Sequence, residues 1–250
     1  MVNAADGRNA TLITAVVVAI GLAVCGYLVG NGAKDFRGKQ RTVTVKGLAD
    51  KDVVSDFVIW TIRLNKTGAE ASEVQNALKQ DREKILAFLA KYNVADADIE
   101  RTPTSTYDRF ASEYNNVKLP VTRYTANATV IVRSAKVDVV RIALASTDDL
   151  LQSGVLLSGG RDDGRPNVVY RYTKFNDLRP ELISNATKNA RASAEKFAAD
   201  SSKVVGSIRS AQQGLIQIFG EEGSDESNSY SSSSFRKKIR VVNTIEFDIE

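Results

Sequence analysis

Residues 55–64 read SDFVIWTIRL, and their β-branched and aromatic side chains are typical of a β-strand. The expected inward face is formed by Val58, Trp60, Ile62 and Leu64. In residues 41–47 (RTVTVKG) apolar and polar side chains alternate, as they do in a half-buried strand. The segment between the two stretches, LADKDVV (48–54), is short and polar, so the two strands are expected to form a hairpin.

Three other stretches follow the period of a helix: 70–92, 136–154, and one that begins near Asp177. Asn93 and Gly154 suit the ends of the first two. The expected inward residues of these two helices are Val74, Leu78, Ile85, Leu89 and Tyr92, and then Val139, Ile142, Ala143, Leu150 and Leu151. The expected inner face of the third helix has small residues at four-residue spacing, together with two larger ones: Ala186, Ala190, Ala194 and Ala198, with Ile183 and Phe197. Such a face predicts close packing against a sheet or another helix.

The remaining strands are expected at 98–110, 122–134, 207–218 and 236–249, with a further pair inside 155–173. Each helix then follows a pair of strands. This order is typical of an α+β fold, with a mainly antiparallel sheet and three helices, and argues against a doubly wound sheet. The folded domain is therefore expected to cover residues 41–250. A polar, acidic stretch at 220–234 predicts a flexible loop within it.

The chain begins with a ten-residue tail (1–10) and then runs TLITAVVVAIGLAVCGYLVG (11–30), with no charged residue between Arg8 and Lys34. As a helix this run is about 30 Å long, which matches the hydrocarbon core of a bilayer. It is longer than the apolar core of a cleaved signal, and no Ala-x-Ala site follows it. We therefore expect a single transmembrane anchor, with a charged connector at 31–40. A cleaved signal or a lipoprotein modified at Cys25 are the alternatives.

One side of this predicted anchor helix is lined by small residues, and it ends in the G-x-x-x-G sequence GYLVG. Small side chains allow two helix backbones to approach closely in lipid. The candidate self-association residues are Ala15, Ala19, Ala23, Gly26 and Gly30. The alternative is that alanine and glycine are simply common in membrane helices.

The composition excludes several chemistries. There is no histidine, and the single cysteine, Cys25, lies in the apolar run. The domain therefore lacks Ser-His-Asp and Cys-His arrangements, disulfides and histidine- or cysteine-based metal sites. Most of the net charge of +4 lies in residues 1–41, so the nearly neutral domain is not expected to bind nucleic acid.

No stretch carries a recognisable catalytic, metal or cofactor-binding motif, so none of these sites is expected. The paired carboxylates Asp162 and Asp163 in GGRDDGRPN are the strongest candidate for acid–base or metal chemistry. Adjacent acids in a glycine-rich stretch are more typical of a solvated turn.

Three separated segments resemble the SIMPL domain, a family that includes periplasmic immunogenic proteins of Gram-negative bacteria. They are RTVTVKGLADKDVVSDFVIWTI (41–62), ATKNARASAEKFAADSS (186–202) and KKIRVVNTIEFDIE (237–250). The resemblance implies an α+β domain exported across the inner membrane, with members that form ring- or barrel-like homo-oligomers. It implies no catalytic residues, because the biochemical activity of the family is unknown.

These observations favour a single-pass protein of the bacterial inner membrane whose domain is periplasmic, self-assembles into a ring or cage, and is not an enzyme. Its expected partners are other copies of itself and the lipid bilayer. Its role would be envelope organisation or stress protection. Lysine and arginine residues from Lys34 to Arg41 instead suggest a cytoplasmic-facing adaptor that binds another protein, since such residues tend to remain in the cytoplasm. A hydrolase that uses Asp162 and Asp163 is the third alternative.

Overall fold

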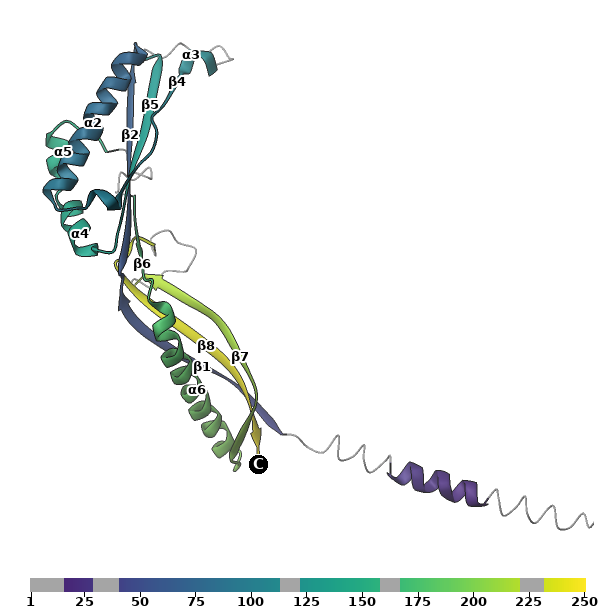
Figure 1. Ribbon diagram of the computed structural model, residues 1–250. Helices are drawn as coiled ribbons and strands as arrows, with labels where there is room; N and C mark the ends of the chain where they lie inside the picture. The colour runs from purple at the N-terminus through teal and green to yellow at the C-terminus, as the bar shows by residue number, and fades with distance from the viewer. Residues whose placement is uncertain (1–15, 29–40, 113–121, 158–166, 221–231) are drawn as a thin grey trace, which may run out of the picture. The chain divides into compact units, whose positions relative to one another are not determined.

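Strand β2 (Phe57–Gly68) is hydrogen-bonded on both sides within a five-stranded antiparallel sheet of order β3-β5-β2-β6, in which β4 also pairs with β5. The structure is a computed structural model that describes residues 16–28, 41–112, 122–157, 167–220 and 232–250 (Figure 1). The other strands of this sheet are β3 (Ile99–Arg101), β4 (Ser105–Asp108), β5 (Tyr124–Ser134) and β6 (Asn167–Arg171). The predicted α+β class with mainly antiparallel pairing is confirmed.

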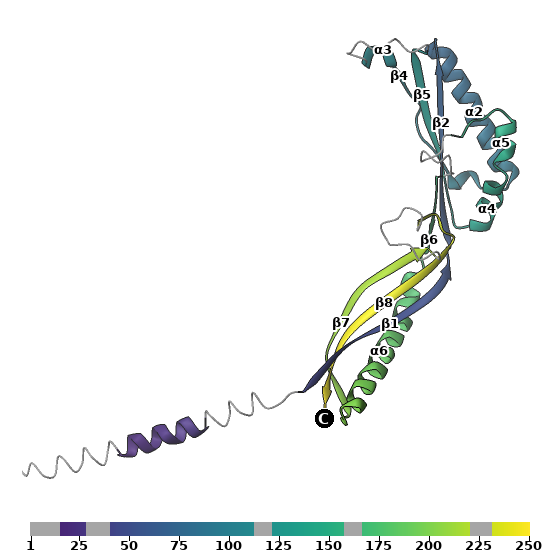
Figure 2. The same ribbon diagram turned by 180° about the vertical axis from the view of Figure 1, so that it is seen from behind.

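Helices cover one face of this sheet, as Figures 1 and 2 show from opposite sides. They are α2 (Ala71–Lys91), α4 (Val137–Ala145) and α5 (Asp148–Gln152). The predicted inward residues of β2 are all 2% exposed or less, and those of α2 pack against them, with Tyr92 at the margin. Helix α2 ends at Lys91, and Asn93, just beyond it, has a φ of 61°, the left-handed conformation that stops a helix.

A second, three-stranded sheet has the order β1-β8-β7, and helix α6 lies along one of its faces (Figure 1). These elements are β1 (Thr42–Val54), α6 (Phe175–Asp200), β7 (Val205–Gly220) and β8 (Arg236–Ile249). The described chain divides into two compact units. One contains residues up to 46, 190–212 and 244–250, and the other contains 47–189 and 213–243.

The alanine face of α6 is buried as predicted, since Ala186, Ala190, Ala194 and Ala198 are all 0% exposed. In one unit Ala190 and Ala194 pack on β1 and β8, and in the other Ala186 does so. The prediction was wrong for Phe197, which is 60% exposed. A helix turns about 100° per residue, so Phe197 lies well to one side of Ala198 and projects away from the narrow contact.

The predicted hairpin at 48–54 is wrong, because β1 continues to Val54 and pairs in a different sheet from β2. Ala49 is buried between exposed neighbours, so the polar residues of this segment are the outer face of a long strand. Asp50 accepts two hydrogen bonds from the Arg240 guanidinium, at 2.9 and 3.0 Å. Polar residues on an exposed strand face thus resembled a turn in the sequence.

The count of three helices was also wrong. The second predicted helix is split into α4 and α5 near Ser146, and Ile142 and Leu151 are exposed rather than buried. The described residues also include a short helix α3 (Arg109–Ser112) and the 3-10 turn η1 (Asp96–Asp98), so the stretch 98–110 is not one strand.

Of the strand pair predicted inside 155–173, only β6 is observed among the described residues. Gly154, with φ of 82°, ends α5, and the Val155 N–H donates to the Leu150 carbonyl at 3.0 Å. Val155 is therefore buried as part of a helix terminus rather than in a strand.

Residues 16–28 form a helix whose side chains are all exposed. Among the described residues, no helix combines the length and the apolarity that crossing a membrane requires. The ends of the predicted anchor, 11–15 and 29–30, lie outside the described residues, as does most of the predicted flexible loop 220–234. The anchor and the loop stay predictions.

Replacing Ala190 with leucine is expected to destabilise the protein by about 1–3 kcal/mol, because the added atoms must force α6 away from the sheet. The matched control is Ala192→Leu on the exposed side of the same helix, which should change stability little. Urea unfolding followed by circular dichroism at one protein concentration measures both. Equal unfolding midpoints for the two variants would contradict the close contact.

Candidate functional site: the outer edge of strand β7

Strand β7 lies at one end of the three-stranded sheet, and no strand among the described residues pairs with its outer edge. Residues 207–215 of this strand are all exposed, without the alternation that a covered face would produce. The strand is sixteen residues long. A long strand with an unpaired row of N–H and C=O groups is a template for pairing with another chain.

The side chains of this edge do little to prevent such pairing. Natural edge strands are protected by lysines, prolines or bulges. Between Ser207 and Gly220 the sequence has no proline, and Arg209 is its one charged residue. The apolar residues on this stretch include Leu215, which is 84% exposed, together with Ile208 and Ile218.

The inner edge of β7 is held firmly against β8. The hydroxyls of Ser207 and Ser210 donate hydrogen bonds to Asp248 and Glu246 of β8, at 3.1 and 3.2 Å. A Cβ added at Gly214 would lie 2.7 Å from the carbonyl oxygen of Val242, so only glycine permits the close approach there. The inner edge is therefore fixed, and the outer edge is presented to solvent.

A buried lysine lies on the covered face of β8. Lys237 is 5% exposed and occupies the first of the alternating buried positions of the strand. Its ammonium donates to the Ser232 carbonyl at 3.3 Å. Burial penalises the charged form and lowers the pKa of Lys237 to about 8.

The described residues contain no candidate metal site. Within them, no group of three or more histidine, cysteine or acidic side chains is placed to hold a metal ion. Asp162 and Asp163 lie outside the described residues. The expectations of no metal, no cofactor and no catalytic residue therefore stay predictions.

The predicted self-association residues are only partly described. Ala19, Ala23 and Gly26 lie on the helix formed by residues 16–28, whereas Ala15 and Gly30 lie outside the described residues. Their role in helix pairing stays a prediction. The edge of β7 was not identified from the sequence as a site, although the weak alternation of SIRSAQQGL (207–215) is a signal of a strand exposed on both faces.

Comparison with known families shows a match over most of the chain. The model described as "SIMPL: Protein of unknown function (DUF541)" matches residues 43–243. No curated protein matches the chain. The match runs from the start of β1 into β8, so it includes both sheets and the whole of β7.

The lowered pKa of Lys237 predicts a dependence of stability on pH. Between pH 8 and 10.5 the unfolded chain keeps a proton that the folded chain has released, so the free energy of unfolding rises with pH in this window. Lys237→Met should abolish the rise. Below pH 8 this substitution should raise the free energy of unfolding by about 1–2 kcal/mol. This is less than the full pKa shift would give, because the ammonium keeps part of its hydration.

The control for this measurement is Lys238→Met, because the neighbouring lysine has a side chain that is 40% exposed. It should retain the pH dependence of the unchanged protein. Urea unfolding at several pH values provides the data. If the free energy of unfolding rises with pH equally in Lys237→Met and in the unchanged protein, the buried ammonium does not cause the rise.

Proposed function

The chain belongs to the SIMPL family, and from that premise we propose that it is a non-enzymatic envelope protein that assembles with copies of itself. In this proposal residues 11–30 hold it in the inner membrane of a bacterium, and the domain lies in the periplasm. The proposed role of the protein is to organise or protect the bacterial envelope. The observation that carries the proposal is the exposed outer edge of β7.

Self-association follows from the chemistry of this edge. An exposed strand with one charge in fourteen residues has a strong tendency to pair with another strand. Pairing would satisfy its backbone groups and remove the Leu215 side chain, which is 84% exposed, from water. A second copy of the chain is always present at matching concentration, which makes it the simplest partner.

A ring is favoured over an isolated pair because the three-stranded sheet has two ends. Within the described residues, both β1 and β7 have an unpaired outer edge. If β7 of one copy pairs with β1 of the next, the contact is heterologous and repeats around a closed ring. One anchor for each subunit is compatible with cyclic symmetry about an axis normal to the membrane.

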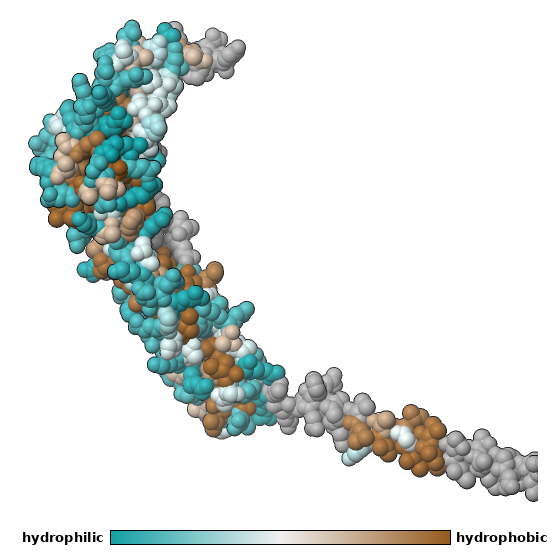
Figure 3. All heavy atoms as spheres, viewed as in Figure 1, coloured by the Kyte–Doolittle hydropathy of each residue, from teal (hydrophilic) through white to brown (hydrophobic). Residues whose placement is uncertain are grey.

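Support for anchoring comes from the surface of residues 16–28, which is almost continuously hydrophobic (Figure 3). In water such a surface is unfavourable by about 25 cal/mol per Å². Lipid or detergent would cover it. The same helix carries Ala19, Ala23 and Gly26, which would let anchors of neighbouring subunits pack closely.

The assembly is tested by placing a charge on the edge. Leu215→Lys should weaken each subunit contact by about 1–3 kcal/mol, or roughly ten- to a hundredfold in affinity, because the ammonium loses water in the pairing strand. Negative-stain imaging and light scattering of the detergent-extracted full-length protein should show rings for the unchanged chain and smaller species for the variant. Leu156→Lys, at another exposed leucine that is not on β7, is the control. A monomeric unchanged protein would disprove the assembly.

The anchor and its orientation are tested together in cells. Amino-terminal sequencing of the native protein is expected to begin before residue 11, and externally added protease should digest the domain in spheroplasts. A first residue at or beyond 31 would show that the apolar run is removed. A domain shielded from the protease would instead favour the cytoplasmic-facing adaptor.

A further inference from the structure

The five-stranded sheet has one face that α2, α4 and α5 do not cover (Figures 1 and 2). The buried residues of β2 lie at every second position and pack against these helices. Arg63, Asn65 and Thr67 occupy the alternate positions and are exposed, so they are on the uncovered face. Figure 3 shows a pale strip of intermediate hydropathy along β5 and β4. This part of the surface is therefore neither strongly apolar nor densely charged.

The pairing register brings side chains of three strands into one polar row on this face. Asn65 is opposite Asn127 of β5, and Asn127 is opposite Ser105 of β4. Arg63 begins the next row on one side, and Tyr107 ends the next row on the other. Rows on one face of a sheet are about 7 Å apart, and neighbouring strands are about 4.8 Å apart. One extended ligand can therefore contact all of these side chains.

Asn65 and Asn127 present one acceptor and one donor side by side. The Asn65 amide donates to the Asn127 side-chain oxygen at 2.9 Å, which holds both amides in place. The Asn65 Oδ1 atom and the Asn127 NH₂ group make no hydrogen bond with any described residue. An acetamido group has one N–H donor and one C=O acceptor, so it can pair with both.

Arg63 supplies positive charge to this face. Its side chain is exposed and makes no ion pair or hydrogen bond within the described residues. Glu100 of β3 is on the same face, but it already pairs with Arg133. An arginine without a partner can bind a carboxylate through two parallel hydrogen bonds. With one such arginine in these three rows, the face fits a ligand that carries few negative charges.

Tyr107 offers an aromatic surface beside the row of amides. The hydroxyl of its neighbour, Thr106, accepts a hydrogen bond from Gln75 of α2 at 3.2 Å, so Thr106 faces the helices. Tyr107 therefore points to the uncovered face, where it is 49% exposed. The C–H groups of a sugar ring carry partial positive charge, and they pack against the electron-rich face of such a ring.

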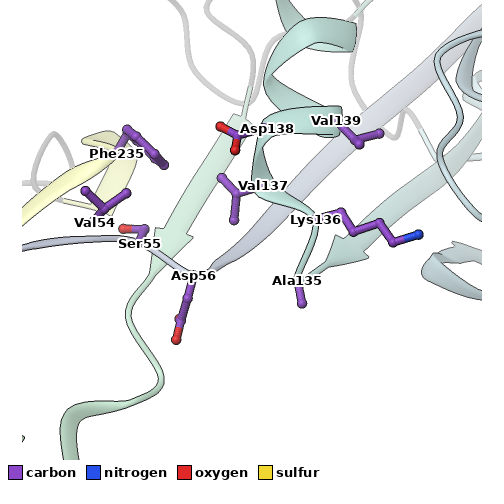
Figure 4. A pocket seen from close by; sticks show the side chains of 9 residues that line it. All are labelled: Val54, Ser55, Asp56, Ala135, Lys136, Val137, Asp138, Val139 and Phe235. Carbon is purple, nitrogen blue, oxygen red and sulfur yellow. The ribbon is translucent and has the colours of Figure 1, made fainter.

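A separate cavity of about 380 Å³ beside the start of α4 does not compete for the same ligand. Asp56 and Asp138 line it, and their carboxylates disfavour an anion. The Ser55 hydroxyl is buried and points away from the first turn of α4 (Figure 4). The uncovered face of the sheet is the better site for an anionic ligand.

We propose that this face binds a sparsely charged anionic polysaccharide whose sugars carry acetamido and carboxylate groups. Asn65 and Asn127 pair with an acetamido group, Arg63 binds a carboxylate, and Tyr107 packs against a sugar ring. Single-stranded nucleic acid fits less well, because it carries one phosphate for every nucleotide. An acidic protein also fits less well, since the centre of a protein interface is apolar and these rows have no aliphatic side chain. The site does not involve the β7 edge, and binding needs no assembly through it.

The probe is a fluorescein-labelled hyaluronan hexasaccharide, in which glucuronate and N-acetylglucosamine alternate. Titration with the full-length protein in detergent should raise its anisotropy to saturation at millimolar concentrations or below. Three unlabelled competitors separate the contributions. Chitohexaose lacks the carboxylate, hexaglutamate lacks the sugar, and a hexanucleotide of thymidine carries phosphates. Each should compete at least about fivefold more weakly than unlabelled hyaluronan hexasaccharide, because each loses one class of contact.

Absence of saturation by the labelled hexasaccharide would overturn the proposal. Equal or stronger competition by hexaglutamate or by the hexanucleotide would also overturn it, in favour of an acidic protein or of nucleic acid. Equal competition by chitohexaose would show that the charge of Arg63 is not used, which contradicts the assignment of an anionic ligand.

The decisive variant is Arg63→Gln. It should weaken binding of the hyaluronan hexasaccharide by about three- to tenfold and leave the affinity for chitohexaose unchanged, because only the charged contact is lost. Arg179→Gln, at an exposed arginine of α6, removes the same charge elsewhere and should alter neither affinity. Tyr107→Ser should weaken both sugars. Unchanged affinities in folded Arg63→Gln or Tyr107→Ser protein, or an equal loss in Arg179→Gln, would contradict the proposed site.

Discussion

The close contact between α6 and the three-stranded sheet is the constraint on which the rest of the molecule depends. Four alanines at four-residue spacing are fully buried, so the helix approaches the sheet through methyl groups alone. A helix is about 10 Å wide and neighbouring strands are about 4.8 Å apart, so one helix covers two strands. The buried residues of the sheet accordingly lie mainly on β1 and β8. Helix α6 therefore does not cover β7, and the exposure of β7 follows from the width of the helix.

A polar side chain fixes where the helix lies along the sheet. A smooth alanine face could slide by a turn at little cost in apolar contact. Asn243 is buried on the covered face of β8, and its amide donates to the Ile183 carbonyl and the Thr187 hydroxyl of α6, both at 3.3 Å. Sliding the helix would leave this amide without partners, which costs about 1–3 kcal/mol. Apolar packing thus supplies the contact, and the asparagine selects its register.

The sequence predicts the elements of this molecule better than their pairing. The two-residue spacing of apolar side chains on β2 and the helical stripe of α2 identified the buried faces, because both patterns are local and follow from backbone geometry. The path of β1 was missed, since its pairing partner, β8, lies nearly two hundred residues away. The candidate edge was missed for the same reason. An unpaired edge is defined only by what the rest of the chain leaves uncovered.

The two outer edges of the three-stranded sheet differ in charge, and the difference favours head-to-tail pairing in the proposed assembly. Strand β1 is rich in charged residues, but several are neutralised within the chain: Asp50 by Arg240, Lys51 by Glu181, and Asp52 by Lys238. Charges already paired keep their partners when a neighbouring strand docks, so they add little repulsion. If β7 of one copy paired with β7 of another, the contact would be symmetric and the assembly would stop at a dimer. The outer edge of β1 would then stay unpaired in both copies. Pairing β7 with β1 covers both kinds of edge at once, and only that arrangement leaves no edge unpaired when the ring closes.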